Sequence, residues 1–116
     1  MIRLFVYGTL LSGEDNHYLI QRADFLCPTH TAPAFSLVDL GGYPAMVAGG
    51  GTSIAGELYH VDLQTLARLD LFEEVPELYR RVQINIAGSD TAAYVLPQTH
   101  AGSAPIIPSG SWRKRA

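Results

Sequence analysis

The sequence predicts an α+β fold: a mostly antiparallel, strongly curved sheet or small mixed β-barrel, with flanking helices packed against it. Short runs rich in β-branched and aromatic residues recur along the chain, separated by glycine and proline turns. Helical periodicity is confined to two segments, one near the N-terminus and one after the middle of the chain. Parallel strands need long crossover connections, and two helices cannot supply them for all these strands. A purely parallel sheet is therefore excluded.

Strands and turns fill most of the first half of the chain. Residues 2–7 are rich in β-forming side chains and stop at Gly8, which indicates a buried strand entering a tight loop over 9–13. Gly56 lies inside a later strand, where a glycine marks a bulge or a close approach of backbone. The other elements expected here are a short helix over 14–22, an extended run over 25–40 broken at Pro28 and Pro33, a turn at 41–44, and strands over 45–48 and 53–61.

A helix and a hairpin are expected in the second half. Asp62 is a good N-cap, because its side-chain oxygen can accept a backbone N–H one turn further on. The helix that follows presents one apolar arc, formed by Leu63, Leu66, Ala67 and Leu69. Residues 79–87 then alternate between apolar and polar side chains, as a strand with one buried face does. A turn at 88–90 leads back into a final strand over 91–96.

Length and composition are those of one compact domain. The 116 residues are 47% hydrophobic, which suits a single domain over 1–116 with a Pro/Gly/Ser-rich tail, about 98–116, packed on it. A formal charge of −3 argues against nucleic acid as a partner. No apolar run approaches the ~20 residues needed to cross a bilayer, and the single cysteine, Cys27, fits a reducing compartment. We expect a cytoplasmic protein without a membrane partner, as a monomer or weak homodimer.

Two carboxylates draw attention because they fall inside the apolar arc of the expected helix. Asp70 and Glu73 lie three residues apart, so one helix face carries both toward the core or a cleft. Burying an unpaired carboxylate is costly, or forces the group to take a proton. If both acids are partly buried, each opposes the ionisation of the other, and one could serve as a base near neutral pH. A structural pair between Glu73 and an arginine such as Arg81 is the alternative interpretation.

The loop Tyr7-Gly8-Thr9-Leu10 is a second candidate. A glycine directly after a buried strand lets the backbone turn sharply and expose successive N–H groups, which can hold an anion. A carboxylate suits this loop better than a phosphate, because the spacing of a P-loop is absent. Tyr43, Tyr79 and Tyr94 are candidates to line a pocket, although aromatic residues on strands are more often core. The four histidines show no ligand spacing, so we expect no metal site.

Several short motifs follow one another in a specific order. Phe5-Val6-Tyr7-Gly8-Thr9-Leu10 resembles the N-terminal YGTL or YGSL motif of γ-glutamylcyclotransferase-like proteins. Leu69-Asp70-Leu71-Phe72-Glu73, with Tyr79 and Arg81 after it, resembles that family's LDxFE…YxR segment. Gly42-Tyr43-Pro44-Ala45 and Gly56-Glu57-Leu58-Tyr59 lie between them in the family's order. The ending Ser109-Gly110-Ser111-Trp112-Arg113 is similar to the SGDWR ending of short bacterial members, with Ser111 in place of the usual aspartate.

The resemblance implies a fold, a reaction and a set of site residues. The family fold is a small barrel of mixed strands with flanking helices, and its members include γ-glutamylcyclotransferases and γ-glutamylamine cyclotransferases. By this resemblance the chain is a transferase that releases 5-oxoproline from a γ-glutamyl amine or amino acid and needs no cofactor. Glu73 matches the catalytic general acid/base, with Asp70 in support. The substrate-binding residues implied are Tyr7, Gly8, Thr9, Leu10, Tyr43, Tyr79 and Arg81.

The reaction makes physical sense of these residue types, but alternatives stay open. Attack of the substrate's α-amine on its own γ-carbonyl is intramolecular, so the protein needs mainly a base, an acid and an anion clamp. The same cavity could act on another small amide, or bind a cationic ligand on Glu73 without catalysis. A purely structural role, in which Glu73 neutralises Arg81, predicts that Glu73→Gln destabilises the fold.

Overall fold

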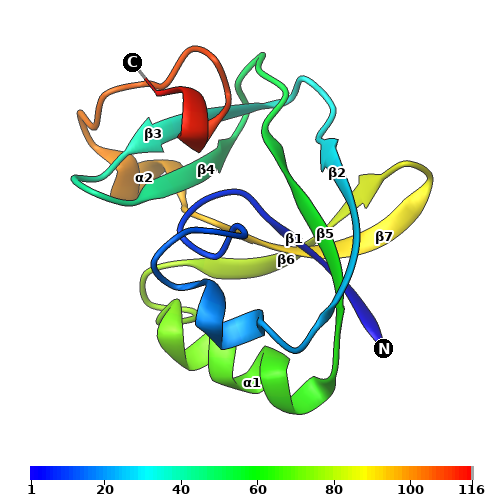
Figure 1. The fold of residues 1–116 in the computed structure, drawn as a ribbon. Coiled ribbons are helices and arrows are strands. Elements are labelled where there is room, and N and C mark those ends of the chain that lie inside the picture. The colour runs from blue at the N-terminus through cyan, green and yellow to red at the C-terminus, as the bar shows by residue number, and fades with distance from the viewer. Residues whose placement is uncertain (116) are drawn as a thin grey trace.

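Two β-sheets organise the chain in the computed structural model, which describes residues 1–115 (Figure 1). In spatial order, the larger sheet contains β2 (Asp24–His30), β5 (Ala55–Val61), β1 (Ile2–Val6), β7 (Ser89–Val95) and β6 (Arg80–Ile86). The central strand β1 runs antiparallel to β5 and parallel to β7, and the remaining pairs are antiparallel. The expected α+β class, with a sheet of mixed direction, is confirmed.

The expectation of a closed barrel is wrong for the part of the chain described. Strands β2 and β6 form the two edges of the larger sheet, and no ladder joins them. A separate antiparallel ribbon is formed by β3 (Phe35–Asp39) and β4 (Pro44–Ala48). The predicted extended run over 25–40 is thus divided between two sheets, because the chain leaves β2 after His30 and begins a new pairing at Phe35. Pro28 is tolerated within β2 because that strand is an edge.

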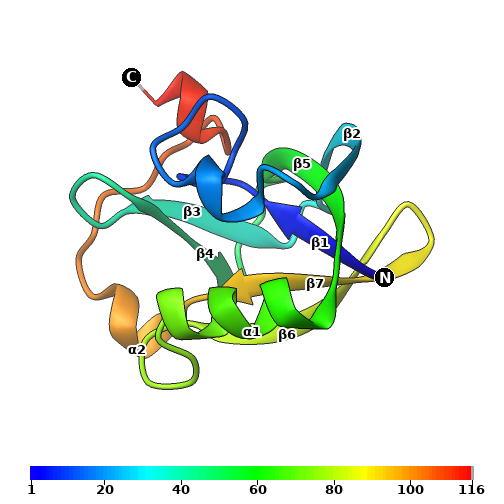
Figure 2. The same ribbon diagram turned by 60° about the horizontal axis from the view of Figure 1, so that its bottom comes forward.

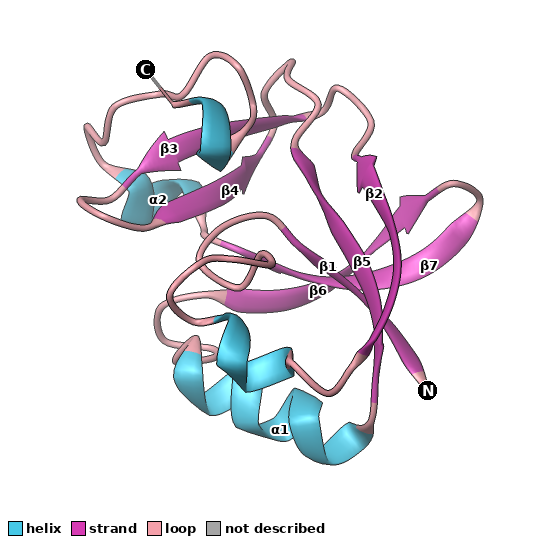
Figure 3. Ribbon diagram, in the orientation of Figure 1, coloured by secondary structure: helices cyan, strands magenta, loops and turns pink. Residues whose placement is uncertain are grey.

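Helix α1 (Leu63–Phe72) packs near the 3-10 helix η1 (His17–Ile20) on one side of the larger sheet (Figures 2 and 3). The predicted cap is present, because the Asp62 side chain accepts the Thr65 N–H at 2.7 Å. The buried face is narrower than the predicted arc: Leu66 and Leu69 are buried, whereas Leu63 is 75% exposed. Ala67 is exposed as well. A single row of side chains, three or four residues apart, therefore packs inward and leads directly to Glu73.

The helix expected over 14–22 is reduced to the four residues of η1. The bonds of this segment span three residues rather than four, because the His17 N–H donates to Glu14 O at 3.2 Å and the Leu19 N–H donates to Asn16 O at 3.1 Å. The segment is also tied to the loop before it, since the Glu14 N–H donates to Leu11 O and the Asn16 N–H donates to Thr9 O, both at 3.0 Å. The Asn16 amide also donates to the Thr9 hydroxyl at 2.9 Å. These bonds fold residues 8–16 into a compact loop beside the end of β1.

The turn of the β6–β7 hairpin begins one residue earlier than predicted, and β7 begins two residues earlier. The turn is Ala87–Gly88, both with positive φ, so β7 begins at Ser89. Turns of this type match the twist of the strands they join. The predicted alternation along β6 is confirmed, since Val82 and Ile84 are partly buried while Arg81, Gln83 and Asn85 are exposed.

The C-terminal segment joins the two sheets. After the short helix α2 (Gln98–Ala101), the Ile107 N–H donates to Leu37 O at 2.7 Å, and the Ala55 N–H donates to Gly110 O at 2.8 Å. The segment ends in the 3-10 helix η2 (Trp112–Lys114), where Trp112 is 2% exposed. Figure 2 shows η2 beside the loop that follows β1. Among residues 1–115, no helix has the length and apolar character that a membrane crossing requires.

Candidate active site

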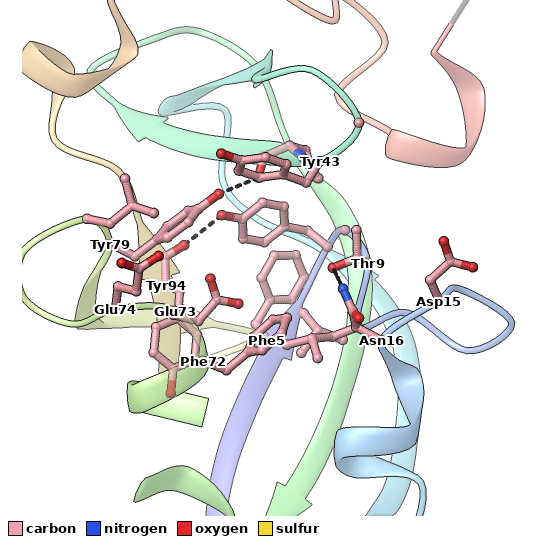
Figure 4. Close-up of a pocket in the computed structure, with 17 residues that line it drawn as sticks. Phe5, Thr9, Asp15, Asn16, Tyr43, Phe72, Glu73, Glu74, Tyr79 and Tyr94 are labelled. Atoms are coloured by element: carbon pink, nitrogen blue, oxygen red, sulfur yellow. Dashed lines mark hydrogen bonds between the residues drawn. The ribbon is translucent and has the colours of Figure 1, made fainter. Parts of the chain in front are cut away.

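A cavity of about 480 Å³ opens where β1 ends, between the C-terminal end of α1 and the β3–β4 turn (Figure 4). Figure 4 shows Glu73 and Glu74 on one side of it and Thr9 and Asn16 on the opposite side. Two of the residues assigned to the site from sequence, Asp70 and Arg81, do not line it. Those that do line it are Tyr7, Gly8, Thr9, Leu10, Tyr43, Glu73 and Tyr79.

Glu73 is fixed by backbone contacts at the end of α1. Its N–H donates to Leu69 O at 2.8 Å, and its carbonyl accepts the Tyr79 N–H at 3.3 Å. No hydrogen bond or ion pair to its carboxyl group occurs within residues 1–115. Burial raises the pKa of Glu73 from 4.5 to about 7. A carboxyl group with this pKa is close to half ionised at neutral pH, so it can both take up and return a proton.

Asp70 and Arg81 instead form a pair of their own. Arg81 Nε donates to Asp70 Oδ1 at 3.0 Å, and the Tyr94 hydroxyl donates to the same oxygen at 2.8 Å. Desolvation, and not the expected repulsion from Asp70, accounts for the raised pKa of Glu73. Arg81 is therefore neither the partner of Glu73 nor a lining residue. The reason is the position of Arg81 on β6, which brings its side chain to Asp70 in the last turn of α1 and not to Glu73.

In the loop after β1, the backbone carbonyl groups have hydrogen-bond partners and three N–H groups do not, within the part of the chain described. Its carbonyl groups bond back into the protein: Gly8 O accepts the Leu11 N–H (3.0 Å), Thr9 O the Asn16 N–H (3.0 Å) and Leu10 O the His17 Nδ1–H (2.8 Å). The N–H groups of Gly8, Thr9 and Leu10 donate to no acceptor in residues 1–115. Adjacent free N–H groups form a concavity that binds anions. These three residues are therefore the candidate carboxylate cradle, on the side of the cavity opposite Glu73.

Gly8 is required by close packing rather than by its backbone angles. A Cβ added there would lie 2.4 Å from Pro44 Cγ, well inside contact distance. Pro44 opens β4 and lines the cavity, so the loop and the ribbon touch at this point. The absence of a side chain at Gly8 therefore lets the loop pack against the β3–β4 ribbon. The sequence predicted a need for glycine here only because of the tight turn.

Tyrosine hydroxyls tie the walls of the cavity to one another. The Tyr7 hydroxyl donates to Tyr94 O at 2.8 Å and accepts the Met46 N–H at 3.0 Å. The Tyr79 hydroxyl donates to Pro44 O at 2.8 Å. Burial, with Coulombic repulsion from Glu73 contributing, raises the pKa of both Tyr7 and Tyr79. These phenols stay protonated and fix the geometry, whereas Tyr43 is 42% exposed at the rim.

Several lining residues were not identified from sequence. They are Phe5, Val6, Asp15, Asn16, Gly42, Pro44, Phe72, Glu74 and Leu78. Tyr94, a candidate pocket residue from the sequence, lines the cavity as well. Some of them lay inside the quoted motifs, which was the available signal for Phe5 and Phe72. Apart from the tyrosines, the ionisable side chains that line the cavity are Asp15, Glu73 and Glu74, and no lysine, arginine or histidine of residues 1–115 lines it. In residues 1–115, no group of three or more His, Cys, Asp or Glu side chains is arranged to hold a metal ion.

Comparison with known proteins places this arrangement in context. Residues 4–114 match the family described as Gamma-glutamyl cyclotransferase, AIG2-like. A Vibrio cholerae protein, whose name marks it as a candidate γ-glutamylcyclotransferase, is 43% identical over 112 residues, covering 97% of this chain and 96% of its own. The Gamma-glutamylaminecyclotransferase of Bos taurus is 37% identical over 93 residues, 72% of this chain. The chain is much shorter than that relative, and the match covers 55% of the bovine protein.

A solved structure supports the same relationship. The solution structure of the protein ytfP from Escherichia coli superposes with a TM-score of 0.78 at 32% identity. The match covers 98% of each chain. Sequence and fold therefore agree over nearly all of the described chain, including the segments that surround the cavity.

Proposed function

Because the chain belongs to the AIG2-like gamma-glutamyl cyclotransferase family, we propose that it releases 5-oxoproline from a γ-glutamyl amine, with Glu73 as general acid and base. The observation that carries the proposal is the unpaired carboxyl group of Glu73, which lines one cavity together with Gly8, Thr9 and Leu10, three residues whose N–H groups have no acceptor among residues 1–115. Each of these groups has a role in the cyclisation, and the roles are chemically complementary.

The substrate's α-carboxylate would rest on the N–H groups of Gly8, Thr9 and Leu10. No cationic side chain lines the cavity, so backbone donors are the groups there that can neutralise this charge. With the carboxylate held, the neighbouring α-amine is directed toward Glu73. Folding the γ-glutamyl chain inside the cavity brings the amine to its own γ-carbonyl, which lowers the entropic barrier to ring closure.

Glu73 then moves one proton through the reaction. The ionised carboxylate takes the proton from the α-amine as the nitrogen bonds to the γ-carbonyl carbon. The protonated acid returns it to the leaving nitrogen as the amide C–N bond breaks. The products are 5-oxoproline and a free amine, and no water is consumed. A group whose pKa lies near 7 suits both halves of this cycle.

The charges on the cavity wall favour an amine over an amino acid as the leaving group. Glu74 lines the cavity beside Glu73, whereas Asp15 lies on the side of Thr9 and Asn16 (Figure 4). A leaving group with its own carboxylate would be repelled by Glu73 and Glu74, whereas a second ammonium group would be attracted. We therefore propose γ-glutamyl amines, in particular those of diamines, as the preferred substrates.

The direct test is release of 5-oxoproline from a panel of γ-glutamyl amines and γ-glutamyl amino acids. We expect the wild type to form product, fastest from a γ-glutamyl diamine. Glu73→Gln should fold, bind the same substrate and lose at least a hundredfold in kcat, since a positioned acid–base group contributes about 10²–10⁴. Asp70→Asn removes a nearby carboxylate outside the cavity and is the matched control. A Glu73→Gln variant with a normal rate, or a folded wild type that makes no product, would contradict the proposal.

A further inference from the structure

A second buried carboxylate, Glu57 on β5, lies behind the cradle and has no part in the proton transfer. Its side chain is 8% exposed. Burial alone would raise the pKa of Glu57, but hydrogen bonds from Ser12 and Tyr59 and the charge of Arg113 hold it below its usual value. The Ser12 N–H and hydroxyl donate to Glu57 at 2.9 and 2.8 Å, and the Tyr59 hydroxyl donates at 3.0 Å. Glu57 is thus a fixed negative charge in the fold.

Arg113 completes this network from the far end of the chain. Its Nη1 lies 3.4 Å from Glu57 Oε2, and its Nη2 donates to the carbonyl and the hydroxyl of Ser12. The guanidinium group therefore contacts both the buried acid and the loop backbone. Ser12 lies in the same loop, residues 8–16, whose residues 8–10 line the cavity.

The bond from Arg113 to the Ser12 carbonyl affects how the peptide groups of the loop are oriented. From Gly8 to Leu11, the carbonyl groups accept hydrogen bonds from within the loop or from His17. The carbonyl of Ser12 is the last of the series, and its donor is Arg113. Peptide units whose oxygens are held on the protein side present their N–H groups on the cavity side. Releasing Ser12 would let the end of the loop rotate.

We propose that Arg113 and Glu57 are positioning residues that hold the carboxylate cradle of the active site in its binding conformation. The proposal rests on the function proposed above, because it assigns the free N–H groups of Gly8, Thr9 and Leu10 to substrate binding. It gives the C-terminal segment a role in substrate affinity in addition to its packing.

Packing of the segment does not depend on Arg113. Trp112 is buried and the Gly110 carbonyl pairs with the Ala55 N–H, so the tail has its own anchors. The Arg113 side chain itself is 43% exposed, which is more than a residue needed for the core would be. Loss of its guanidinium group should therefore loosen the loop and leave the fold in place.

The test compares Arg113→Ala with Lys114→Ala. Lys114 is the neighbouring cationic residue, and its side chain makes no hydrogen bond or ion pair within residues 1–115, so its removal is a matched control. With the preferred γ-glutamyl amine, we expect Arg113→Ala to raise KM about tenfold, the equivalent of one charge-assisted hydrogen bond, with a smaller change in kcat. Arg113→Lys should recover part of the loss, and added guanidinium ion should lower the KM of Arg113→Ala but not of the control. An unchanged KM, or insensitivity to guanidinium, would overturn the proposal.

A measurement without turnover separates this inference from the reaction itself. Amide hydrogen exchange at Leu11, Ser12 and Asn16, whose N–H groups donate within the loop or to Glu57, should accelerate in Arg113→Ala and not in Lys114→Ala when it is followed by NMR. L-glutamate, which carries the α-amine and α-carboxylate but no leaving group, should shift the amide signals of Gly8, Thr9 and Leu10 in the wild type and bind less tightly to Arg113→Ala. If the wild type forms no 5-oxoproline while these differences appear, the reaction is wrong and the positioning role holds. Identical exchange and glutamate binding in all three proteins would refute the positioning role.

Discussion

At the scale of single residues, the site depends on which carboxylates have partners. Asp70 is bound by Arg81 and the Tyr94 hydroxyl, and Glu57 is bound by Ser12, Tyr59 and Arg113. Glu73 lacks such a partner among the described residues and lies in a desolvated position. A buried group without compensation costs folding free energy, so this difference in partners is what singles out Glu73 as the candidate acid–base group.

The pH dependence of stability should reveal this cost. The pKa of Glu73 is about 7 in the folded protein and near 4.5 in an unfolded chain, so the folded state binds more protons between these values. Stability should therefore fall as pH rises from 4.5 to 7, by up to about 3 kcal/mol. Glu73→Gln should remove this part of the dependence and be more stable than the wild type at pH 8, and about equal to it at pH 4.

Urea unfolding of both proteins at pH 4, 6 and 8 provides the measurement. Taking the difference between the two proteins cancels groups that titrate identically in both. A structural role for Glu73, as the partner of a buried arginine, has the opposite sign, because Glu73→Gln would then be the less stable protein at pH 8. That result would also contradict the observed pairing of Arg81 with Asp70.

The activity should follow the same titration. If Glu73 acts as a base, kcat/KM should increase with pH through an acidic limb near pH 7, where the carboxyl group ionises. The residual activity of Glu73→Gln should lack that limb. Rates from pH 5 to 8.5, on a substrate whose own groups do not titrate below 8.5, give the profile. A limb that persists unchanged in Glu73→Gln would assign the base to another group.

Charge on the rim should control the choice of leaving group. Glu74 lines the cavity next to Glu73, and its replacement by lysine reverses a charge there. Glu74→Lys should lower kcat/KM for a γ-glutamyl diamine relative to a γ-glutamyl amino acid by about tenfold, the equivalent of ~1.4 kcal/mol. Glu77→Lys makes the same change at a residue outside the lining and should leave the ratio unaltered. Equal ratios in both variants would remove Glu74 from substrate selection.

At the scale of elements, the hairpin between β6 and β7 contains a correctable defect. Ala87 has φ +53°, a left-handed conformation that disfavours side chains with a Cβ. Ala87→Gly should therefore stabilise the protein by about 0.5–1 kcal/mol, despite the entropy that glycine adds to the unfolded chain. Thermal unfolding measures this, with Ala92→Gly on the buried part of β7 as a contrasting substitution that should destabilise. A lower Tm for Ala87→Gly would show that the turn is not strained.

Local patterns predicted the elements that carry their own signals. The Asp62 cap, the alternation along β6 and the close approach at Gly56, where an added Cβ would lie 2.1 Å from Val6 O, are all present. The shortening of the expected helix to η1 was not predicted, because it accompanies bonds between residues 14–16 and the loop before them, which no periodic pattern marks. The pairing of Arg81 was missed for a related reason: it depends on the register of β6 against α1, which no local period defines.

At the scale of the whole molecule, the same limit explains the missing barrel. Short β-rich runs indicate how many strands exist but not which edges meet, and here β3 and β4 leave the larger sheet to form their own ribbon. The site was easier to predict than its surroundings because its motifs lie at the ends of β1 and α1. Tyr43 and Pro44 form the wall of the cavity that the β3–β4 ribbon contributes. A motif contains these residues, but no sequence pattern predicted where the ribbon lies.

The C-terminal segment holds that ribbon to the larger sheet, and Trp112 should carry most of this stabilisation. Its ring is buried, with the Arg115 guanidinium 3.6 Å from the ring centroid, so Trp112→Ala should cost about 3–5 kcal/mol, a large share of the stability of a small domain. Arg113→Ala should cost far less while raising KM more. Urea unfolding and kinetics on both variants test this contrast. If Trp112→Ala remained as stable as the wild type, the ribbon would be held by the main-chain bonds at Leu37 and Ala55, and the tail would serve the cradle alone.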